Sequence, residues 1–208
     1  MGPAVLSLDD YRRRACAEPA AFPASPSTAP PARGAIDHHQ SQRARQGARW
    51  EALVETRLAF LASHRRLAWI RTPQPHRVIG HAHEGVVVVF TGDGPPDYII
   101  ATGGVTIAAD AKSTTAERWS LSLLEDHQAR SLDELASHGV VGAIFLLLCG
   151  EAFVLPWRAL RGRWWTWYAT PGRADNGTAS LSPADVAAIG WPMDAGGQWL
   201  DQLKEGVK

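Results

Sequence analysis

The sequence predicts an α/β domain built on a mixed β-sheet, and three observations support this prediction. Apolar residues recur at helical spacing between Ser41 and His64, which predicts an amphipathic helix. Several short segments typical of strands follow, with a second helical segment among them. Val140–Cys149 is a continuous apolar run, as expected for a central strand buried on both faces. Helix, strands, helix and strands in this order favour a mixed sheet with helices packed against it.

The composition limits the classes of protein that the chain can belong to. Its 208 residues are 45% hydrophobic and include nine tryptophans, which is enough for a buried core. We expect no membrane span, because no run of about 18 uncharged apolar residues occurs. The formal net charge of zero argues against coating nucleic acid by bulk charge. Eight arginines against three acids between Asp37 and Arg77 nevertheless predict a local basic surface.

The two cysteines indicate a reducing compartment. We place Cys16 in a tail and Cys149 in a buried strand, so we predict no disulfide between them. A cytoplasmic location fits this pattern.

The first half of the chain begins with a tail and continues into the domain. Residues 1–40 are rich in proline and alanine without apolar periodicity, which predicts a disordered tail. The helix over 41–64 has an apolar stripe, formed by Trp50, Leu53, Val54, Leu58 and Leu61. Leu67–Ile70 and Val86–Phe90 predict strands. The polar, His-rich segment 76–85 between them is expected to be a flexible surface loop.

The second helix has recognisable ends. Ser122 and Glu125 have the spacing of a capping box at its start. Gly139 is expected to cap its end, because glycine adopts the backbone conformation that terminates helices.

The last part of the chain completes the expected domain, which spans residues 41–195. Ala152–Trp157 predicts a strand that pairs with Val140–Cys149. The Trp-rich cluster at 164–167 favours core or dimer packing, and stacking on nucleic-acid bases is the alternative. Ser182 followed by proline predicts the start of a short helix. Residues 196–208 are expected to be a C-terminal tail.

A hairpin around Gly103-Gly104 holds the most informative residues. Two glycines suit the positive φ angles of a type I′ turn, and this turn sets a register in which Asp97 faces Asp110. Facing residues have Cβ atoms about 4.5–5.5 Å apart, so the two carboxylates repel unless one is protonated or a cation lies between them. Strand alternation also places Lys112 on the face of Asp110.

Oxygen ligands in this arrangement suit Mg²⁺ or Mn²⁺, with Lys112 as a positive charge directed at a phosphate. The alternative is a surface hairpin with solvated charges. The neighbouring residues are apolar on both faces, which indicates a buried sheet: they are Ile99, Ile100, Val105 and Ile107. Burying acids at the end of such a sheet is costly, which favours a functional site.

This pattern resembles a known signature. Pro96-Asp97, twelve residues and Asp110-Ala111-Lys112 are similar to the PD-(D/E)xK nuclease motif. Over residues 43–192 the chain also resembles the RecU-type Holliday-junction resolvases. The segments that carry the resemblance are Gly47–Glu51, Arg71–Pro75, Asp97-Tyr98, Asp110–Thr114, His127-Gln128, Val140–Leu148 and Ser182–Trp191. Asp110 stands where that family has Glu, and Pro96 where it has Thr.

The resemblance implies a restriction-endonuclease-like mixed β-sheet flanked by helices, with a projecting stalk at about 71–93 between two strands. It implies that Asp97, Asp110, the Ala111 carbonyl and Glu51 hold Mg²⁺ (or Mn²⁺). Lys112 would assist the nucleophilic water.

The resemblance also assigns Gln128 to the catalytic residues. On its helix Gln128 shares a face with leucines, which places it toward the sheet. Its hydrogen-bond partner is then Lys112 or a water of the site, or alternatively the backbone.

DNA contacts are expected from three residues of the stalk and its base. Arg71 leaves the sheet beside the site, and His76 and Arg77 follow within the stalk.

The function implied is that of a homodimeric endodeoxyribonuclease that resolves four-way DNA junctions in recombination and repair. Each subunit would nick one strand by hydrolysis. Two alternatives remain: a nuclease of the same chemistry on other DNA, such as a restriction-like or flap-cutting enzyme, and a non-catalytic DNA-binding or cell-wall-associated factor.

Overall fold

The computed structural model describes residues 36–73, 76–82, 85–90, 94–172 and 179–205 of the chain. Residues 1–35, most of the expected N-terminal tail, lie outside the described residues. The strands are β1 (Ala68–Arg71), β2 (His76–Ala82), β3 (Gly85–Phe90), β4 (Tyr98–Thr102), β5 (Val105–Thr114), β6 (Trp119–Ser120), β7 (Val141–Leu148), β8 (Glu151–Pro156), β9 (Ser180–Leu181) and β10 (Trp191–Pro192). The helices are α2 (Ile36–Ser63), the 3-10 turn η1 (Leu121–Leu123), α3 (Asp126–Ser137), α4 (Trp157–Ala169), α5 (Pro183–Ile189) and α6 (Gln198–Glu205).

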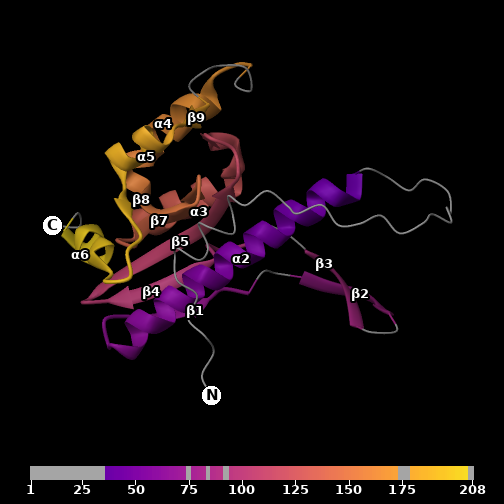
Figure 1. The fold of residues 1–208 in the computed structure, drawn as a ribbon, viewed down its shortest axis with the longest axis horizontal. Helices are drawn as coiled ribbons and strands as arrows, with labels where there is room; N and C mark the ends of the chain where they lie inside the picture. The colour runs from indigo at the N-terminus through magenta and orange to yellow at the C-terminus, as the bar shows by residue number, and fades with distance from the viewer. Residues whose placement is uncertain (1–35, 74–75, 83–84, 91–93, 173–178, 206–208) are drawn as a thin grey trace, which may run out of the picture.

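The central sheet is mixed, as the sequence predicts. Its six strands have the order β1-β4-β5-β7-β8-β10. The β5–β7 pair is parallel, and the other neighbouring pairs are antiparallel. The long helix α2 lies along one face of the sheet, while α3, α4 and α5 lie on the other (Figure 1). The predicted fold class, a mixed sheet flanked by helices, is therefore confirmed.

Two hydrophobic cores form on the two faces because side chains alternate along the central strands. In β7, Phe145 packs with α2 and α6, whereas the adjacent Ile144 packs with α3, α4 and α5. Ile107 and Ala108 divide in the same way in β5. Burial on both faces explains the unbroken apolar run at 141–148, as predicted.

The β2–β3 hairpin confirms a projecting element between two strands. It lies between β1 and β4 in the chain, forms a two-stranded sheet of its own and stands apart from the central sheet (Figure 1). The expectation of an irregular loop over 76–85 is wrong for 76–82, because this backbone pairs with β3 in a ladder with a shift between Val78 and Gly80. A polar sequence does not exclude backbone pairing in an antiparallel hairpin.

Several expected local features differ from the structure. Cys149 lies in the turn after β7, exposed and with φ of 51°, because the strand ends one residue before the apolar run does. The capping box at α3 joins Glu125 to Gln128, whereas Ser122 belongs to η1. Gly139 has φ of 82° just after the last turn, as expected for a helix end.

The end of the chain packs into the domain. Residues 198–205 of the expected C-terminal tail form α6, which buries Trp199, Leu200 and Leu203 against the α2 face of the sheet. The segment around 158–170 is helix α4, and its Trp164 and Trp167 are buried, which confirms core packing for the tryptophan cluster. No helix in the described ranges is both long enough and apolar enough to cross a membrane.

Trp50 fixes α2 to the central strand of the sheet. Its Nε1 donates a hydrogen bond of 3.0 Å to the Phe145 carbonyl, and the bond is buried. We expect Trp50→Phe to lower the free energy of unfolding by about 1–3 kcal/mol, because the donor disappears while the buried site stays apolar. Denaturant unfolding measures this loss. Phe60, half exposed on the same helix, supplies the control: Phe60→Leu should change stability by no more than about 0.5 kcal/mol. Equal losses would contradict this role for Trp50.

Candidate active site

The β4–β5 hairpin has the register that its glycines predict. Thr102 pairs with Val105, and the ladder continues to Tyr98 opposite Ala109. Gly103 and Gly104 have φ of 54° and 80°, the positive values that a type I′ turn requires. The ladder ends at this last pair, so Asp97 and Asp110 lie one position beyond it.

Asp97 leaves the strand and turns its carboxylate back onto β5. Its Oδ2 accepts a hydrogen bond of 2.8 Å from the Ala111 backbone N–H. The two carboxylates that were expected to face each other are therefore brought together where the β4–β5 ladder ends. The contact of Asp97 with Ala111 brings them together, and they do not form a ladder pair. Asp97 is half-buried at this position.

Asp110 is the most unusual side chain of the site. It is 1% exposed, and neither carboxylate oxygen accepts a hydrogen bond of good geometry from the described residues. Burial raises the pKa of Asp110 to about 6, while the charge of Lys112 and the Asp97 backbone amide act against this rise. The Asp97 carboxylate adds to it. A buried carboxylate that accepts no hydrogen bond of good geometry is costly, and a bound cation would remove that cost.

Strand alternation decides which helices face Asp110. Asp110 is in register with Ile144 of β7, which belongs to the α3–α4 core, and Lys112 lies on the same face two residues on. The charge of His127, in the first turn of α3, also lowers the pKa of Asp110. The site therefore opens on the α3 side of the sheet.

The structure does not bring Glu51 to this site. Glu51 lies on α2, which covers the opposite face of the sheet, and its carboxylate pairs with the Arg71 guanidinium. Arg71 also pairs with Glu55 at 2.8 Å, so it stands between two acids one helical turn apart. Across the described part of the chain, no three His, Cys, Asp or Glu side chains stand close enough together to hold a metal ion.

Two residues that were not assigned from the sequence lie near Arg71, on the α2 face of the sheet. Glu55 forms an ion pair with Arg71, as Glu51 does. Its position one helical turn after Glu51 was the sequence feature from which this pairing could have been predicted. Tyr98 is fully buried, and its hydroxyl has no hydrogen-bond partner among the described residues. Burial, together with Glu55 and Glu51, raises the pKa of Tyr98, so its hydroxyl stays protonated in the core on the α2 face.

Gln128 caps its own helix. Its Oε1 accepts a hydrogen bond of 3.1 Å from the Glu125 backbone N–H, and the Glu125 side chain accepts one from the Gln128 backbone in return. The side-chain amide of Gln128 was expected to bond either to the site or to the backbone, and the structure shows the bond to the backbone.

These contacts predict different results for two substitutions of Gln128. Gln128→Glu keeps the capping oxygen, so we expect the melting temperature of the wild type. Gln128→Ala removes it and should lower the free energy of unfolding by about 0.5–2 kcal/mol. Thermal and denaturant unfolding measure both. A Gln128→Ala protein as stable as the wild type would contradict the capping role.

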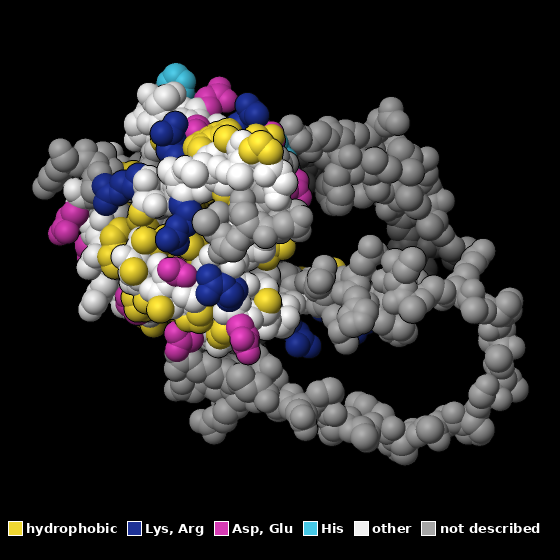
Figure 2. All heavy atoms as spheres, turned by 90° about the horizontal axis from the view of Figure 1, so that it is seen from above, with side chains coloured by type: hydrophobic (Ala, Val, Ile, Leu, Met, Phe, Trp, Pro, Cys, Tyr) yellow, Lys and Arg dark blue, Asp and Glu magenta, His cyan; other side chains and the backbone are white. Residues whose placement is uncertain are grey.

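The expected DNA contacts are only partly described. His76 and Arg77 lie on β2, where the structure describes the backbone alone. Arg71 is exposed but engaged by the two acids. The basic surface predicted from 37–77 is partly neutralised in this way, since Arg66 also pairs with Asp201, at 2.9 Å. On the face seen in Figure 2, basic and acidic side chains are interspersed, with apolar side chains between them.

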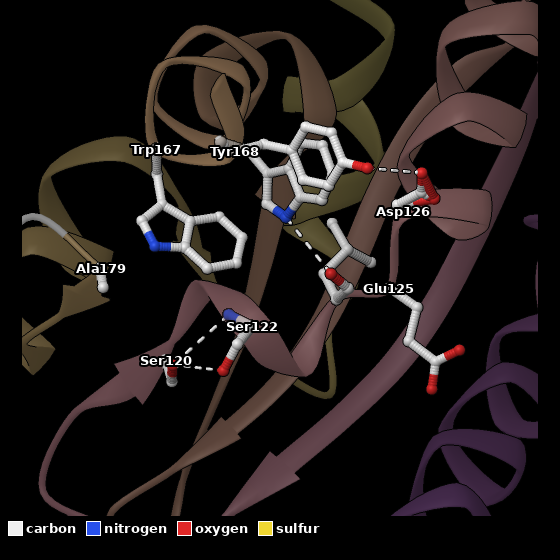
Figure 3. A pocket seen from close by; sticks show the side chains of 9 residues that line it. Ser120, Ser122, Glu125, Asp126, Trp167, Tyr168 and Ala179 are labelled. Carbon is white, nitrogen blue, oxygen red and sulfur yellow. Dashed lines mark hydrogen bonds between the residues drawn. The ribbon is translucent and has the colours of Figure 1, made fainter. Parts of the chain in front are cut away.

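A hollow of about 520 Å³ lies beside the start of α3, between η1 and α4 (Figure 3). Its hydroxyl and carboxylate groups already have partners: Ser120 Oγ lies 2.7 Å from Ser122 Oγ, and the Tyr168 hydroxyl donates to Asp126 at 2.8 Å. The Glu125 carboxylate points away from the aromatic rings. Because these groups satisfy one another, we assign no ligand to the hollow.

The site around Asp110 offers hard oxygen ligands. The carboxylate oxygens of Asp110 and Asp97 fit Mg²⁺ or Mn²⁺ better than a soft metal. The Ala111 carbonyl is a third candidate ligand from the same strand. Glu51, as placed against Arg71, does not join this set.

The comparisons with known proteins find similarity among solved structures and none at the level of sequence. No family model and no curated protein matches the sequence. Among solved structures, the chain is similar to Hjc, a Holliday junction resolvase from the archaeal hyperthermophile Archaeoglobus fulgidus. The identity is 14%, the match covers 71% of this chain and 96% of that chain, and the TM-score is 0.44. The interpretation of the site therefore rests on its own residues.

Proposed function

We propose that this chain is a divalent-metal-dependent DNA endonuclease that nicks four-way junctions as a homodimer. The buried, unpaired carboxylate of Asp110 carries the proposal, because it stands beside Asp97 and Lys112 in the spacing of a nuclease signature. Four-way junctions and the dimer come from the RecU-type resemblance. A two-fold dimer suits a two-fold-symmetric junction, since it places one site on each of two strands.

Each residue has a distinct task in phosphodiester hydrolysis. Asp97 and Asp110 would hold Mg²⁺ or Mn²⁺, with the Ala111 carbonyl as a further ligand. A divalent ion at this position supplies charge for the phosphate oxygens and lowers the pKa of a water. Lys112, on the face of Asp110, would bind a phosphate oxygen and orient the water toward the phosphorus. Hydrolysis then breaks one P–O bond and nicks the strand.

Parallel cleavage assays test the substrate. A synthetic four-way junction and a linear duplex of the same sequence are incubated with Mg²⁺, with Mn²⁺ and with a chelator. We expect paired nicks in the junction with either metal, little cleavage of the duplex, and none with the chelator. Equal cleavage of both substrates would favour a nuclease of the same chemistry with another substrate. No cleavage of any DNA would overturn the proposal.

The non-catalytic alternative is tested with Asp97→Asn. If the chain is an enzyme, this variant loses metal-dependent nicking and still binds the junction. A role in DNA binding alone would instead leave wild type and variant indistinguishable in every assay. Sedimentation of the full chain tests the dimer separately.

A further inference from the structure

The base of the stalk is tied to the site through one residue, Thr72. Thr72 directly follows β1, and its backbone N–H donates a hydrogen bond of 2.9 Å to the carbonyl of Asp97. Its hydroxyl donates a second hydrogen bond to the carbonyl of Pro96. The chain leaves the sheet at Arg71 and returns at Asp97, so Thr72 joins the two ends of the stalk.

These two bonds act at the place where the β4–β5 ladder no longer does. The β4–β5 ladder ends at the pair of Tyr98 and Ala109, one residue before it would reach Asp97. Its carboxylate nevertheless reaches the Ala111 N–H at 2.8 Å. At this point the two hydrogen bonds from Thr72 hold the carbonyls of Pro96 and Asp97.

The neighbouring Arg71 anchors Thr72 in turn. Its guanidinium bridges Glu51 and Glu55, which fixes the end of β1 to α2. Helix α2 is itself held on the sheet by the Trp50 hydrogen bond to Phe145. A continuous set of contacts thus runs from the helix through Arg71 and Thr72 to Asp97.

We propose that Thr72 is a positioning residue for the site: through Pro96 and Asp97 it holds the Asp97 carboxylate where it can share a cation with Asp110. The inference rests on the proposed function and deepens it, because it makes the stalk base part of the metal site. Groups that orient a metal ligand typically change metal affinity about 10–100-fold when they are removed.

Substitution of the hydroxyl tests the inference. Thr72→Val keeps the shape and the backbone N–H but removes the donor to Pro96, and Thr72→Ser restores it. The matched control is Thr102 at the other end of β4, whose hydroxyl donates a bond of 2.7 Å to the Arg66 carbonyl. Thr102→Val therefore removes the same type of hydrogen bond at the opposite end of β4, away from the site.

Calorimetric titration of the full, metal-free protein with Mn²⁺ is the primary measurement, and binding of an uncleaved junction in chelator is the second. We expect Thr72→Val to weaken Mn²⁺ binding about 10-fold or more, and to leave junction binding within about twofold because the residues expected to contact DNA are unchanged. Thr72→Ser should restore the Mn²⁺ affinity, and Thr102→Val should keep it.

Two results would overturn the inference: wild-type Mn²⁺ affinity in Thr72→Val, or an equal loss in Thr102→Val, which would indicate general destabilisation. If the wild type cleaves junctions with metal while Thr72→Val binds Mn²⁺ normally, the positioning role of Thr72 is overturned and the proposed function stands. If the wild type neither binds Mn²⁺ nor cleaves DNA, the proposed function falls and the inference with it.

Discussion

Replacing Asp110 with asparagine is expected to abolish nicking and at the same time to stabilise the metal-free protein. Nicking should fall at least about 100-fold, because the amide cannot supply the charged oxygens that a divalent cation needs. Stability should rise, because the buried carboxylate has no hydrogen-bond partner to offset the loss of solvent. Opposite effects on activity and stability at one position are typical of a residue kept for function.

The pH dependence of stability gives the second half of this prediction. The pKa of Asp110 is raised by burial from 3.8 to about 6, so between these values the folded protein holds a proton that the unfolded chain has lost. The free energy of unfolding of the wild type should therefore decrease as the pH rises through this window and level off above it. The two pKa values correspond to about 3 kcal/mol at neutral pH.

Urea unfolding of the metal-free protein between about pH 4 and 8 measures this effect. Asp110→Asn should lack the decrease and be more stable than the wild type at pH 8. Glu117→Gln removes one exposed carboxylate nearby on the chain and serves as the charge control, with the wild-type profile expected. Mg²⁺ should stabilise the wild type at pH 8 but not Asp110→Asn. Parallel pH profiles for wild type and Asp110→Asn would contradict the prediction.

The hairpin and the sheet could be predicted because their signals are local. Two adjacent glycines determine the turn, the turn determines the register, and the register brings Asp97 to the middle of β5, next to Asp110 and Ala111, where the β4–β5 ladder ends. The run at Val140–Cys149 likewise predicts a doubly buried strand without reference to any other segment. The sequence analysis missed α6, although Trp199, Leu200 and Leu203 show helical spacing.

The pairing of side chains across the fold could not be predicted in the same way. Alternation places Asp110 and Lys112 on one face, but it does not say which helix covers that face. The structure places α2 on the other face, where Glu51 meets Arg71 instead of the carboxylates of the site. The partner of Gln128 was also open, since a local capping box and a site contact are both compatible with its position. Such choices depend on tertiary packing, which the periodicity of a single segment does not contain.

Asp133 is expected to be the most important polar residue for holding α3, the helix that faces the site, against α4. Its Oδ1 accepts hydrogen bonds from Trp157 Nε1 at 2.7 Å and from Arg161 Nε at 2.6 Å, and its Oδ2 accepts one from Trp165 Nε1 at 2.8 Å. Partial burial alone would raise the pKa of Asp133, but these donors lower it. Trp157 is itself 1% exposed and packs against β7 at Gly142, where an added Cβ would lie 2.8 Å from the Trp157 Cβ.

We therefore expect Asp133→Ala to lower the free energy of unfolding by about 2–4 kcal/mol, because it leaves the buried Trp157 N–H without an acceptor and frees Arg161. Urea unfolding at about pH 7 measures the loss of stability. Glu134→Ala changes the exposed neighbour on the same helix and should stay within about 0.5 kcal/mol of the wild type. Well below its melting temperature, Asp133→Ala should nick DNA at close to the wild-type rate, since its carboxylate touches α4 and not Asp97, Asp110 or Lys112. Equal stability of the two variants would show that the apolar core holds α3 and α4 together without Asp133.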